Sequence, residues 1–143
     1  MAAKAVLDAS ALMAALLLGE PSWPAARRIL ERFAQGTLEL SAPTLLTYEV
    51  TNALLKAERK PKRGIDSDVV EAILEELDAL GIPVYGVPMA EVVATARRYG
   101  LWAYDASYLA LAERQNVPLI TSDRRLYNAV KERFDKITWV EDF

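Results

Sequence analysis

Residues 4–12, K-A-V-L-D-A-S-A-L, join a short apolar run directly to a helix-like segment. Residues 5–7 are three consecutive apolar residues near the start of the chain, which favours a strand buried on both faces. Asp8 ends this run, and residues 9–18 are nearly all Ala, Leu and Met, which favour a helix. Asp8 is therefore expected at the exit of a central strand, where open parallel sheets bind ligands. In the alternative interpretation, Asp8 only caps the helix.

The composition excludes several classes of enzyme. The chain has 143 residues, enough for one domain over residues 1–143 that buries about two-thirds of its unfolded surface. It contains no Cys and no His, which excludes disulfides, zinc-thiolate sites, cysteine nucleophiles and Ser-His-Asp hydrolases. Any catalysis must use carboxylates, hydroxyls, amines or a metal. The net charge of −3 argues against a generally basic nucleic-acid coat.

The distribution of apolar residues predicts a cytoplasmic, soluble protein without a membrane anchor. A membrane-spanning helix needs a run of about 18 or more apolar residues, and the longest candidate here follows an aspartate. A secretory signal peptide needs an uninterrupted apolar core near the N-terminus, and Asp8 falls within that position.

Strand and helix patterns alternate along the rest of the chain. The predicted helices cover residues 22–33, 44–59, 67–80, 89–99, 106–115 and 124–131, and short strands cover residues 38–42, 83–87, 118–121 and 137–140. Such alternation predicts a three-layer α/β/α sandwich with a mostly parallel central sheet. The helix over 67–80 has the clearest amphipathic pattern, and we expect its apolar face to be used for packing.

Three further acids are predicted near the site of Asp8. Asp123 follows the strand over 118–121, and Asp105 lies in the first turn of the helix that leads into residues 106–115. Glu49 falls at the edge of the apolar stripe of its helix, where a carboxylate is costly unless it is paired or binds a cation. Two alternatives stay open: Glu49 pairs with Lys56, and Asp105 only favours the start of its helix.

These positions predict a cation site. Asp8 and Asp123 leave the same carboxyl edge of a parallel sheet, and Glu49 and Asp105 can converge on the same crevice. Carboxylates about 4 Å apart repel each other by about 1 kcal/mol in water and about 4 kcal/mol at an intermediate dielectric. Either some of them protonate or a cation binds. Because all the ligands are oxygen atoms, we expect Mg²⁺ or Mn²⁺ rather than zinc.

A basic run follows the helix that carries Glu49. Residues 56–63, K-A-E-R-K-P-K-R, contain five basic residues and one acid. One interpretation is a solvated loop. The other is a contact with an RNA backbone, since this concentrated positive charge lies in an acidic chain.

Four ordered motifs carry a family resemblance: D-A-S at 8–10, Y-E-V-T-N-A-L at 48–54, Y-D-A-S-Y-L-A-L-A at 104–112 and T-S-D at 121–123. Together they resemble PIN-domain ribonucleases, specifically VapC-type toxins of type II toxin-antitoxin pairs, over residues 4–140. The resemblance implies a catalytic, metal-binding tetrad with hydrogen-bonding neighbours. The implied tetrad is Asp8, Glu49, Asp105 and Asp123, and the implied neighbours are Ser10, Asn52 and Thr121.

The resemblance also implies an activity and partners. It implies an Mg²⁺- or Mn²⁺-dependent endoribonuclease that cleaves single-stranded or structured RNA and leaves a 5′-phosphate and a 3′-hydroxyl. It further implies a homodimer that is silenced by a cognate small antitoxin, whose tail lies along the acidic groove. A non-catalytic α/β module that binds protein or RNA is the alternative. A phosphate-receiving signalling domain is disfavoured, because it needs a lysine at the end of the last strand, where residues 137–140 read I-T-W-V.

Overall fold

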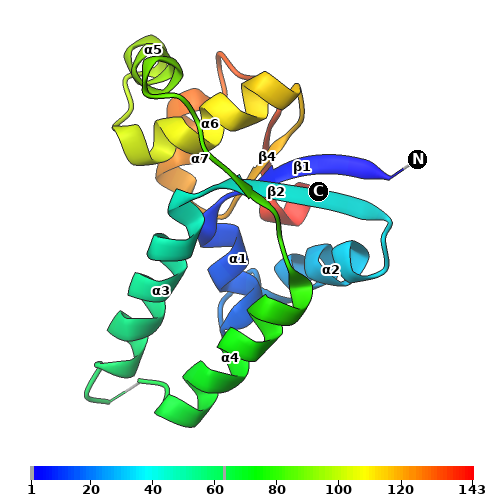
Figure 1. Cartoon of the computed structure of the whole chain (residues 1–143), viewed down its shortest axis with the longest axis vertical. Helices are drawn as coiled ribbons and strands as arrows, with labels where there is room; N and C mark the ends of the chain where they lie inside the picture. The colour runs from blue at the N-terminus through cyan, green and yellow to red at the C-terminus, as the bar shows by residue number, and fades with distance from the viewer. Residues whose placement is uncertain (1, 63) are drawn as a thin grey trace.

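A parallel β-sheet forms the centre of the protein, whose computed structural model describes residues 2–62 and 64–143 (Figure 1). The strand order is β3-β2-β1-β4-β5, and each neighbouring pair runs parallel. The strands are β1 (Ala3–Leu7), β2 (Leu38–Pro43), β3 (Val84–Tyr85), β4 (Leu119–Thr121) and β5 (Ile137–Trp139). The predicted α/β class is confirmed, and the sheet that was expected to be mostly parallel is parallel throughout the described residues.

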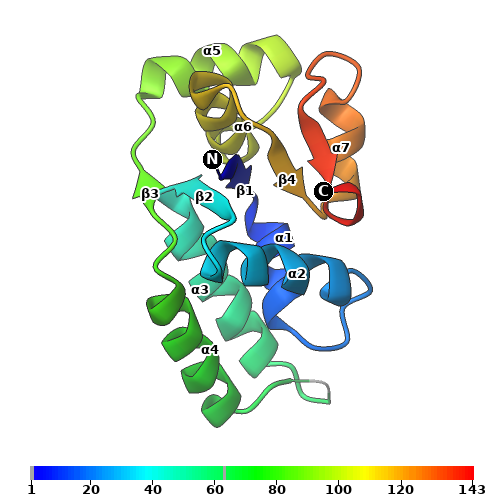
Figure 2. The same cartoon turned by 90° about the vertical axis from the view of Figure 1, so that its right-hand side faces the viewer.

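Helices cover both faces of this sheet. They are α1 (Ala9–Leu16), α2 (Trp23–Ala34), α3 (Leu45–Glu58), α4 (Ser67–Leu80), α5 (Met89–Tyr99), α6 (Ala103–Gln115) and α7 (Arg124–Val130), with a 3₁₀ turn, η1 (Val140–Asp142), at the end. Figures 1 and 2 show α5 and α6 on one side of the sheet and α1 and α2 on the other. The α7 helix packs against β4 and β5. The layers are those of an α/β/α sandwich.

The centre of the core is β1, as its sequence predicts. Residues 5–7 are all buried, because β1 lies between β2 and β4 with helices on both faces. Val6 pairs with Ser41 of β2 and with Leu119 of β4, which fixes the register of the three inner strands. Burying a side chain of this size contributes about 1.5–3 kcal/mol, so this short strand anchors the sheet.

Two helix boundaries differ from the sequence prediction by more than one residue. The α1 helix ends at Leu16, two residues before the predicted end at Leu18, and the chain then turns toward α2. The α6 helix begins at Ala103, three residues before its predicted start, so Asp105 lies within its first turn. Helix ends depend on tertiary contacts as well as on propensity, and boundary shifts of this size are common.

The α3 and α4 helices extend away from the sheet as a pair (Figure 1). The α4 helix packs less closely than its pattern predicts: Ile73 is its one buried residue among those described, and Val69 and Leu74 are exposed. The reason is its position, because the outer end of this pair lies beyond the sheet and has no layer to pack against. None of the helices that the structure describes is long and apolar enough to cross a membrane.

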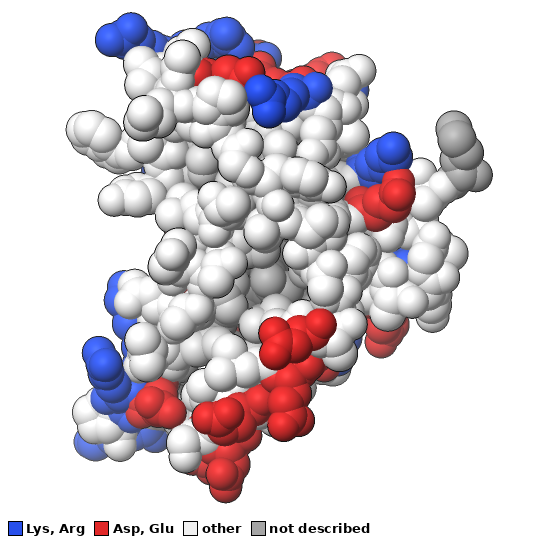
Figure 3. All heavy atoms as spheres, in the orientation of Figure 1, with Lys and Arg blue, Asp and Glu red and all other residues white. Residues whose placement is uncertain are grey.

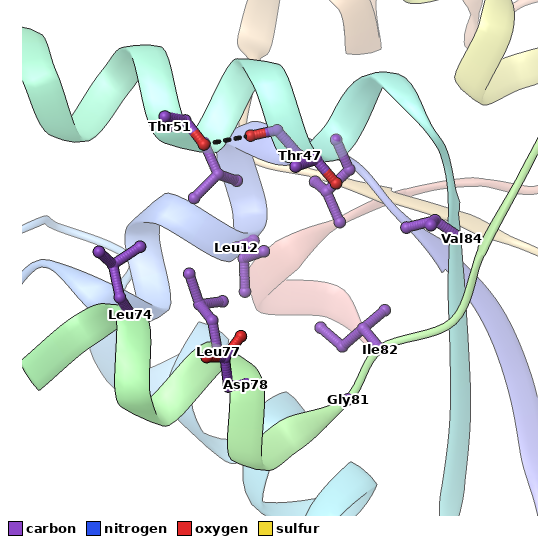
Figure 4. Close-up of a pocket in the computed structure, with 11 residues that line it drawn as sticks. Leu12, Thr47, Thr51, Leu74, Leu77, Asp78, Gly81, Ile82 and Val84 are labelled. Carbon is purple, nitrogen blue, oxygen red and sulfur yellow. Dashed lines mark hydrogen bonds between the residues drawn. The ribbon is translucent and has the colours of Figure 1, made fainter. Parts of the chain in front are cut away.

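An apolar hollow of about 310 Å³ lies between α1, α3 and α4. In Figure 4, Leu12 of α1 and Leu74 and Leu77 of α4 face it, together with Thr47 and Thr51 of α3. The Thr51 hydroxyl donates to the Thr47 carbonyl within the helix, at 2.6 Å. The residues that line this hollow include none of the acids predicted to form the site. The predicted site acids therefore lie outside this hollow.

Charged side chains gather at the ends of the molecule in Figure 3. Acidic side chains lie over α4, and basic side chains lie where α3 ends. The predicted basic run over 56–63 corresponds to this end of α3 and the turn after it, except that Arg63 lies outside the described residues. Most of the surface between these charged ends is uncharged on the face shown, apart from basic and acidic side chains at its right edge.

Candidate active site

The exits of β1 and β4 lie side by side at the carboxyl edge of the sheet. The two strands are hydrogen-bonded neighbours, with Leu7 opposite Ile120. The backbone N–H of Asp8 donates to the Ile120 carbonyl at 2.9 Å. The α1 helix begins directly after Asp8, and α7 begins directly after Asp123. The structure therefore places these two acids at one edge, in the setting that strand exits predict.

Asp8 is held by two hydroxyl groups, and its side chain does not cap the backbone of the helix that follows it. Its Oδ2 atom accepts hydrogen bonds from Ser10 Oγ at 2.5 Å and from Thr121 Oγ1 at 2.9 Å. The Asp8 side chain makes no capping hydrogen bond to α1, so the interpretation of Asp8 as a simple cap is wrong. Two of the three predicted supporting residues, Ser10 and Thr121, contact the acid directly.

The same two hydroxyls connect the exits of the two strands. Ser10 Oγ accepts from the backbone N–H of Ser122 at 3.0 Å, and Thr121 Oγ1 accepts from the backbone N–H of Asp123 at 3.0 Å. Each hydroxyl thus donates a hydrogen bond to Asp8 and accepts one from a backbone N–H at the exit of β4. This network fixes the orientation of the Asp8 carboxylate.

The second oxygen of Asp8 remains open. Although Asp8 is only 5% exposed, Oδ1 accepts no hydrogen bond from the described residues. No fully buried side-chain nitrogen or oxygen in the described residues lacks a partner, so Oδ1, which has none, is not fully shielded from solvent. A carboxylate fixed through one oxygen and open at the other is suited to bind a cation.

Burial raises the pKa of Asp8 from 3.8 to about 6. The hydrogen bonds from Ser10 and Thr121 oppose this rise, and the nearby negative charges of Asp105 and Glu49 add to it. The effect of those two charges shows that Asp8, Glu49 and Asp105 lie in one electrostatic neighbourhood. Without a cation, holding Asp8 ionised at neutral pH costs free energy.

Glu49 is oriented by a buried tyrosine. Tyr108, which is 1% exposed on α6, donates from its hydroxyl to Glu49 Oε1 at 2.6 Å. Burial, together with the Glu49 carboxylate, raises the pKa of Tyr108 far above its ordinary value, so the hydroxyl remains a donor. No ion pair joins Glu49 to Lys56 in the described residues, and the proposed pairing of these two residues is wrong.

Sequence reasoning missed Tyr108 as a member of the site. It lies three residues after Asp105, which places both side chains on one face of α6. That spacing in Y-D-A-S-Y was the available indication. What the sequence could not give was the partner, because Glu49 belongs to a different helix.

Asp105 and Asp123 share one arginine. Arg125 Nη2 lies 2.8 Å from Asp105 Oδ2 and 3.4 Å from Asp123 Oδ2. Asp123 also caps α7, because its Oδ1 accepts from the backbone N–H groups of Arg125 and Leu126 at 3.0 and 3.2 Å. Asp123 therefore caps α7, and this does not prevent it from having a second role. The side chain of Asp105 makes no such cap and faces Arg125.

Asn52, the third predicted supporting residue, is placed differently. It is exposed on α3, one turn after Glu49, and it makes no hydrogen bond to the acids within the described residues. Its supporting role remains a prediction.

The arrangement supplies oxygen ligands of the kind that Mg²⁺ and Mn²⁺ prefer. Asp8 and Glu49 are held by hydroxyl donors, and Asp105 and Asp123 are held by Arg125. Within residues 2–62 and 64–143, however, no three acids approach closely enough to form a metal-binding group in this side-chain arrangement. The donor chemistry fits a divalent cation.

A family model described as PIN domain matches residues 5–132. The chain belongs to the PIN-domain family. This PIN domain is 36% identical over 125 residues to ribonuclease VapC3 of Pyrobaculum aerophilum, covering 86% of the chain and 92% of the relative. It is 34% identical over 93 residues to exonuclease VapC9 of the same organism, covering 64% and 67%. The crystal structure of PAE2754 from Pyrobaculum aerophilum matches it with a TM-score of 0.72 at 30% identity, covering 99% and 93%.

These matches confirm the resemblance that the four sequence motifs indicate. The family match covers all four candidate acids, from Asp8 to Asp123. The likeness to a solved structure extends over nearly the whole chain, in agreement with the α/β/α layers of this PIN domain.

Proposed function

We propose that this chain is a metal-dependent endoribonuclease, a single PIN nuclease domain over residues 1–143, and the toxin of a toxin-antitoxin pair. The observation that carries the proposal is the setting of Asp8: a buried carboxylate at a strand exit, fixed through Oδ2 and open at Oδ1. Such a group costs stability and caps nothing, so a structural role does not explain it. The similarity to a relative named as a ribonuclease also supports a nuclease activity.

The proposed cation ligands are Asp8, Glu49, Asp105 and Asp123. When bound, Mg²⁺ or Mn²⁺ would lower the pKa of water and stabilise negative charge on a phosphate. Ser10 and Thr121 hold the carboxylate of Asp8 in one orientation, and Tyr108 does the same for Glu49. Fixed ligands lose little freedom on binding, which strengthens the site. Because the chain has no His and no Cys, the side-chain ligands proposed here are carboxylates.

The proposed partners are RNA, a small antitoxin and a second copy of the chain. The candidate acids would attract a basic side chain from an antitoxin, as Asp105 already attracts Arg125 within this chain. Trp102 and Met89 are 83% and 85% exposed, which leaves large apolar surfaces that a second copy would cover. Light scattering on a size-exclusion column tests the dimer; a monomer at all concentrations would contradict it.

Cleavage of labelled single-stranded RNA tests the nuclease. The wild type, Asp8→Asn and Asp78→Asn are compared with Mn²⁺ and with EDTA; Asp78 is an exposed acid on α4 and controls for the loss of one charge. We expect Mn²⁺-dependent cleavage by the wild type and Asp78→Asn, and a loss of at least about a hundredfold in Asp8→Asn, because metal-ion catalysis supplies several kcal/mol.

Other outcomes would contradict the proposal. Full activity of Asp8→Asn, or cleavage that EDTA leaves unchanged, would show that the acids are not the catalytic groups. No cleavage under any condition would favour the non-catalytic binding module. Analysis of the products separates two modes of cutting: internal fragments with 5′-phosphates support the endonuclease, whereas stepwise release of single nucleotides supports an exonuclease.

A further inference from the structure

The side chain of Arg125 contacts two of the four candidate acids. Its side chain is 68% exposed, and the contacts that hold it are those to Asp105 and Asp123. Asp105, and then Asp123, raise the pKa of its guanidinium above the ordinary value. Among the ion pairs of the described residues, Arg125 is the one cation that contacts any of the four candidate acids.

The neighbouring arginine shows a different arrangement. The guanidinium of Arg124 lies 3.7 Å from the ring centre of Trp139 and 5.5 Å from that of Tyr127. Arg124 is thus stacked on aromatic rings, away from the acids, whereas Arg125 faces them. Two adjacent residues of the same type, on the same helix, provide a matched pair.

The backbone of Arg125 is fixed while its side chain can turn. Its N–H is held by Asp123 Oδ1 at the start of α7. Beyond the backbone, its guanidinium makes ion pairs at an exposed position, and such pairs are weak because water screens them. The guanidinium can therefore leave Asp105 and Asp123 at low cost when another cation competes for them.

We propose that Arg125 is an internal counter-ion that occupies the cation position of the metal-free protein and moves to a phosphate of the RNA when a divalent ion binds. This inference rests on the proposed function. Its guanidinium can form paired hydrogen bonds with a phosphate as well as with a carboxylate, so both partners suit it.

The proposal couples the two ligands. A divalent ion must displace Arg125 from Asp105 and Asp123, which weakens metal binding to the protein alone. RNA that accepts the displaced guanidinium strengthens metal binding, and by linkage the metal strengthens RNA binding. Removing the guanidinium should therefore have effects of opposite sign on the two ligands, which a merely structural arginine would not produce.

Calorimetric titration with Mn²⁺ tests the first half. The wild type, Arg125→Gln and Arg124→Gln are compared in the absence of RNA, with folding checked by circular dichroism. We expect Arg125→Gln to bind Mn²⁺ about two- to fivefold more tightly, the range that an exposed ion pair can hold back. Arg124→Gln should change the affinity less than twofold. Equal Mn²⁺ affinity in Arg125→Gln and the wild type, or an equal increase in Mn²⁺ affinity in both variants, would overturn the proposal that Arg125 is a counter-ion.

The KM for RNA at saturating Mn²⁺ tests the second half. We expect Arg125→Gln to raise KM about tenfold, because a charged hydrogen bond to phosphate is lost, and Arg124→Gln to leave KM unchanged. Tighter Mn²⁺ binding with an unchanged KM would overturn the movement to phosphate. Failure of the proposed function gives a different result, because the wild type would then bind no Mn²⁺ at all. That result would also overturn the counter-ion proposal.

Discussion

The exits of β1 and β4 carry the same kind of residue and use it differently. Asp8 and Asp123 both follow a buried strand and both precede a helix. Asp123 caps α7 through two backbone N–H groups, whereas Asp8 makes no cap and is instead bound by Ser10 and Thr121. The hydrogen-bond donors of a strand-exit acid therefore distinguish a capping role from another role. Capping explains part of the reason for an acid at position 123, but it does not explain the acid at position 8.

The two acids therefore differ in what they cost the fold. The burial that raises the pKa of Asp8 to about 6 makes its ionised form a liability at neutral pH, and its two hydroxyl donors offset only part of that cost. Asp123 contributes to stability, because it satisfies donors at the start of α7 that would otherwise lack partners. Variants at the two exits should separate these effects.

Asp8→Asn should give the largest change in stability. Because the pKa of Asp8 is raised from 3.8 to about 6, the folded protein holds a proton across that pH window that the unfolded chain releases. The stability contributed by this proton is present below pH 3.8 and is lost as the pH rises to about 6. At neutral pH the ionised group costs about 3 kcal/mol, at about 1.4 kcal/mol per pKa unit.

Urea unfolding in EDTA measures this difference. Asp8→Asn should be more stable than the wild type by up to about 3 kcal/mol at neutral pH, and nearly equal to it at pH values below 3.8. A variant that is less stable at neutral pH would show that the ionised carboxylate supports the fold.

Tyr108→Phe should have the next largest effect, and Tyr99→Phe is its matched control. Tyr99 is also buried and donates to a glutamate, Glu113, at 3.0 Å, on the α5–α6 side away from the candidate acids. Each variant should lose about 2 kcal/mol of stability, the worth of a hydrogen bond to a charged group. Only Tyr108→Phe should lose RNA cleavage, by about tenfold, because Glu49 is no longer oriented. Equal losses of activity in both variants would contradict a positioning role for Tyr108.

Asp123 should give the smallest change in stability. Asn retains an oxygen that caps α7 and Ala does not, so thermal unfolding should place Asp123→Ala about 1 kcal/mol below Asp123→Asn. Both variants should lose RNA cleavage, since neither supplies a carboxylate. Full activity of Asp123→Asn would show that Asp123 serves only as a cap.

The fold could be predicted because its determinants are local. Buried apolar runs mark β1 and β4, and Gly81 and Gly100 end α4 and α5 in the left-handed conformation that glycine favours. The positions of Asp8, Asp105 and Asp123 followed from strand exits and a helix start. These features depend on a few neighbouring residues, which the sequence displays directly.

Other features depend on contacts between distant segments. The hydrogen bond from Tyr108 to Glu49 joins α6 to α3, and Arg125 reaches back to Asp105 across 20 residues. The apolar pattern of α4 correctly predicted a helix but not how much of it packs, since periodicity shows that a face is apolar and not what covers it. The sequence alone therefore could not predict which distant side chains contact each other or how much of α4 is covered.

The most direct test of a shared cation site is the unfolding temperature as Mn²⁺ is added. A ligand that binds only the folded protein raises this temperature progressively with its concentration. We predict that Mn²⁺ raises the unfolding temperature of the wild type and leaves that of Asp8→Asn unchanged, although Asp8→Asn begins higher in EDTA. No rise in the wild type, or an equal rise in both proteins, would contradict a cation site built on Asp8.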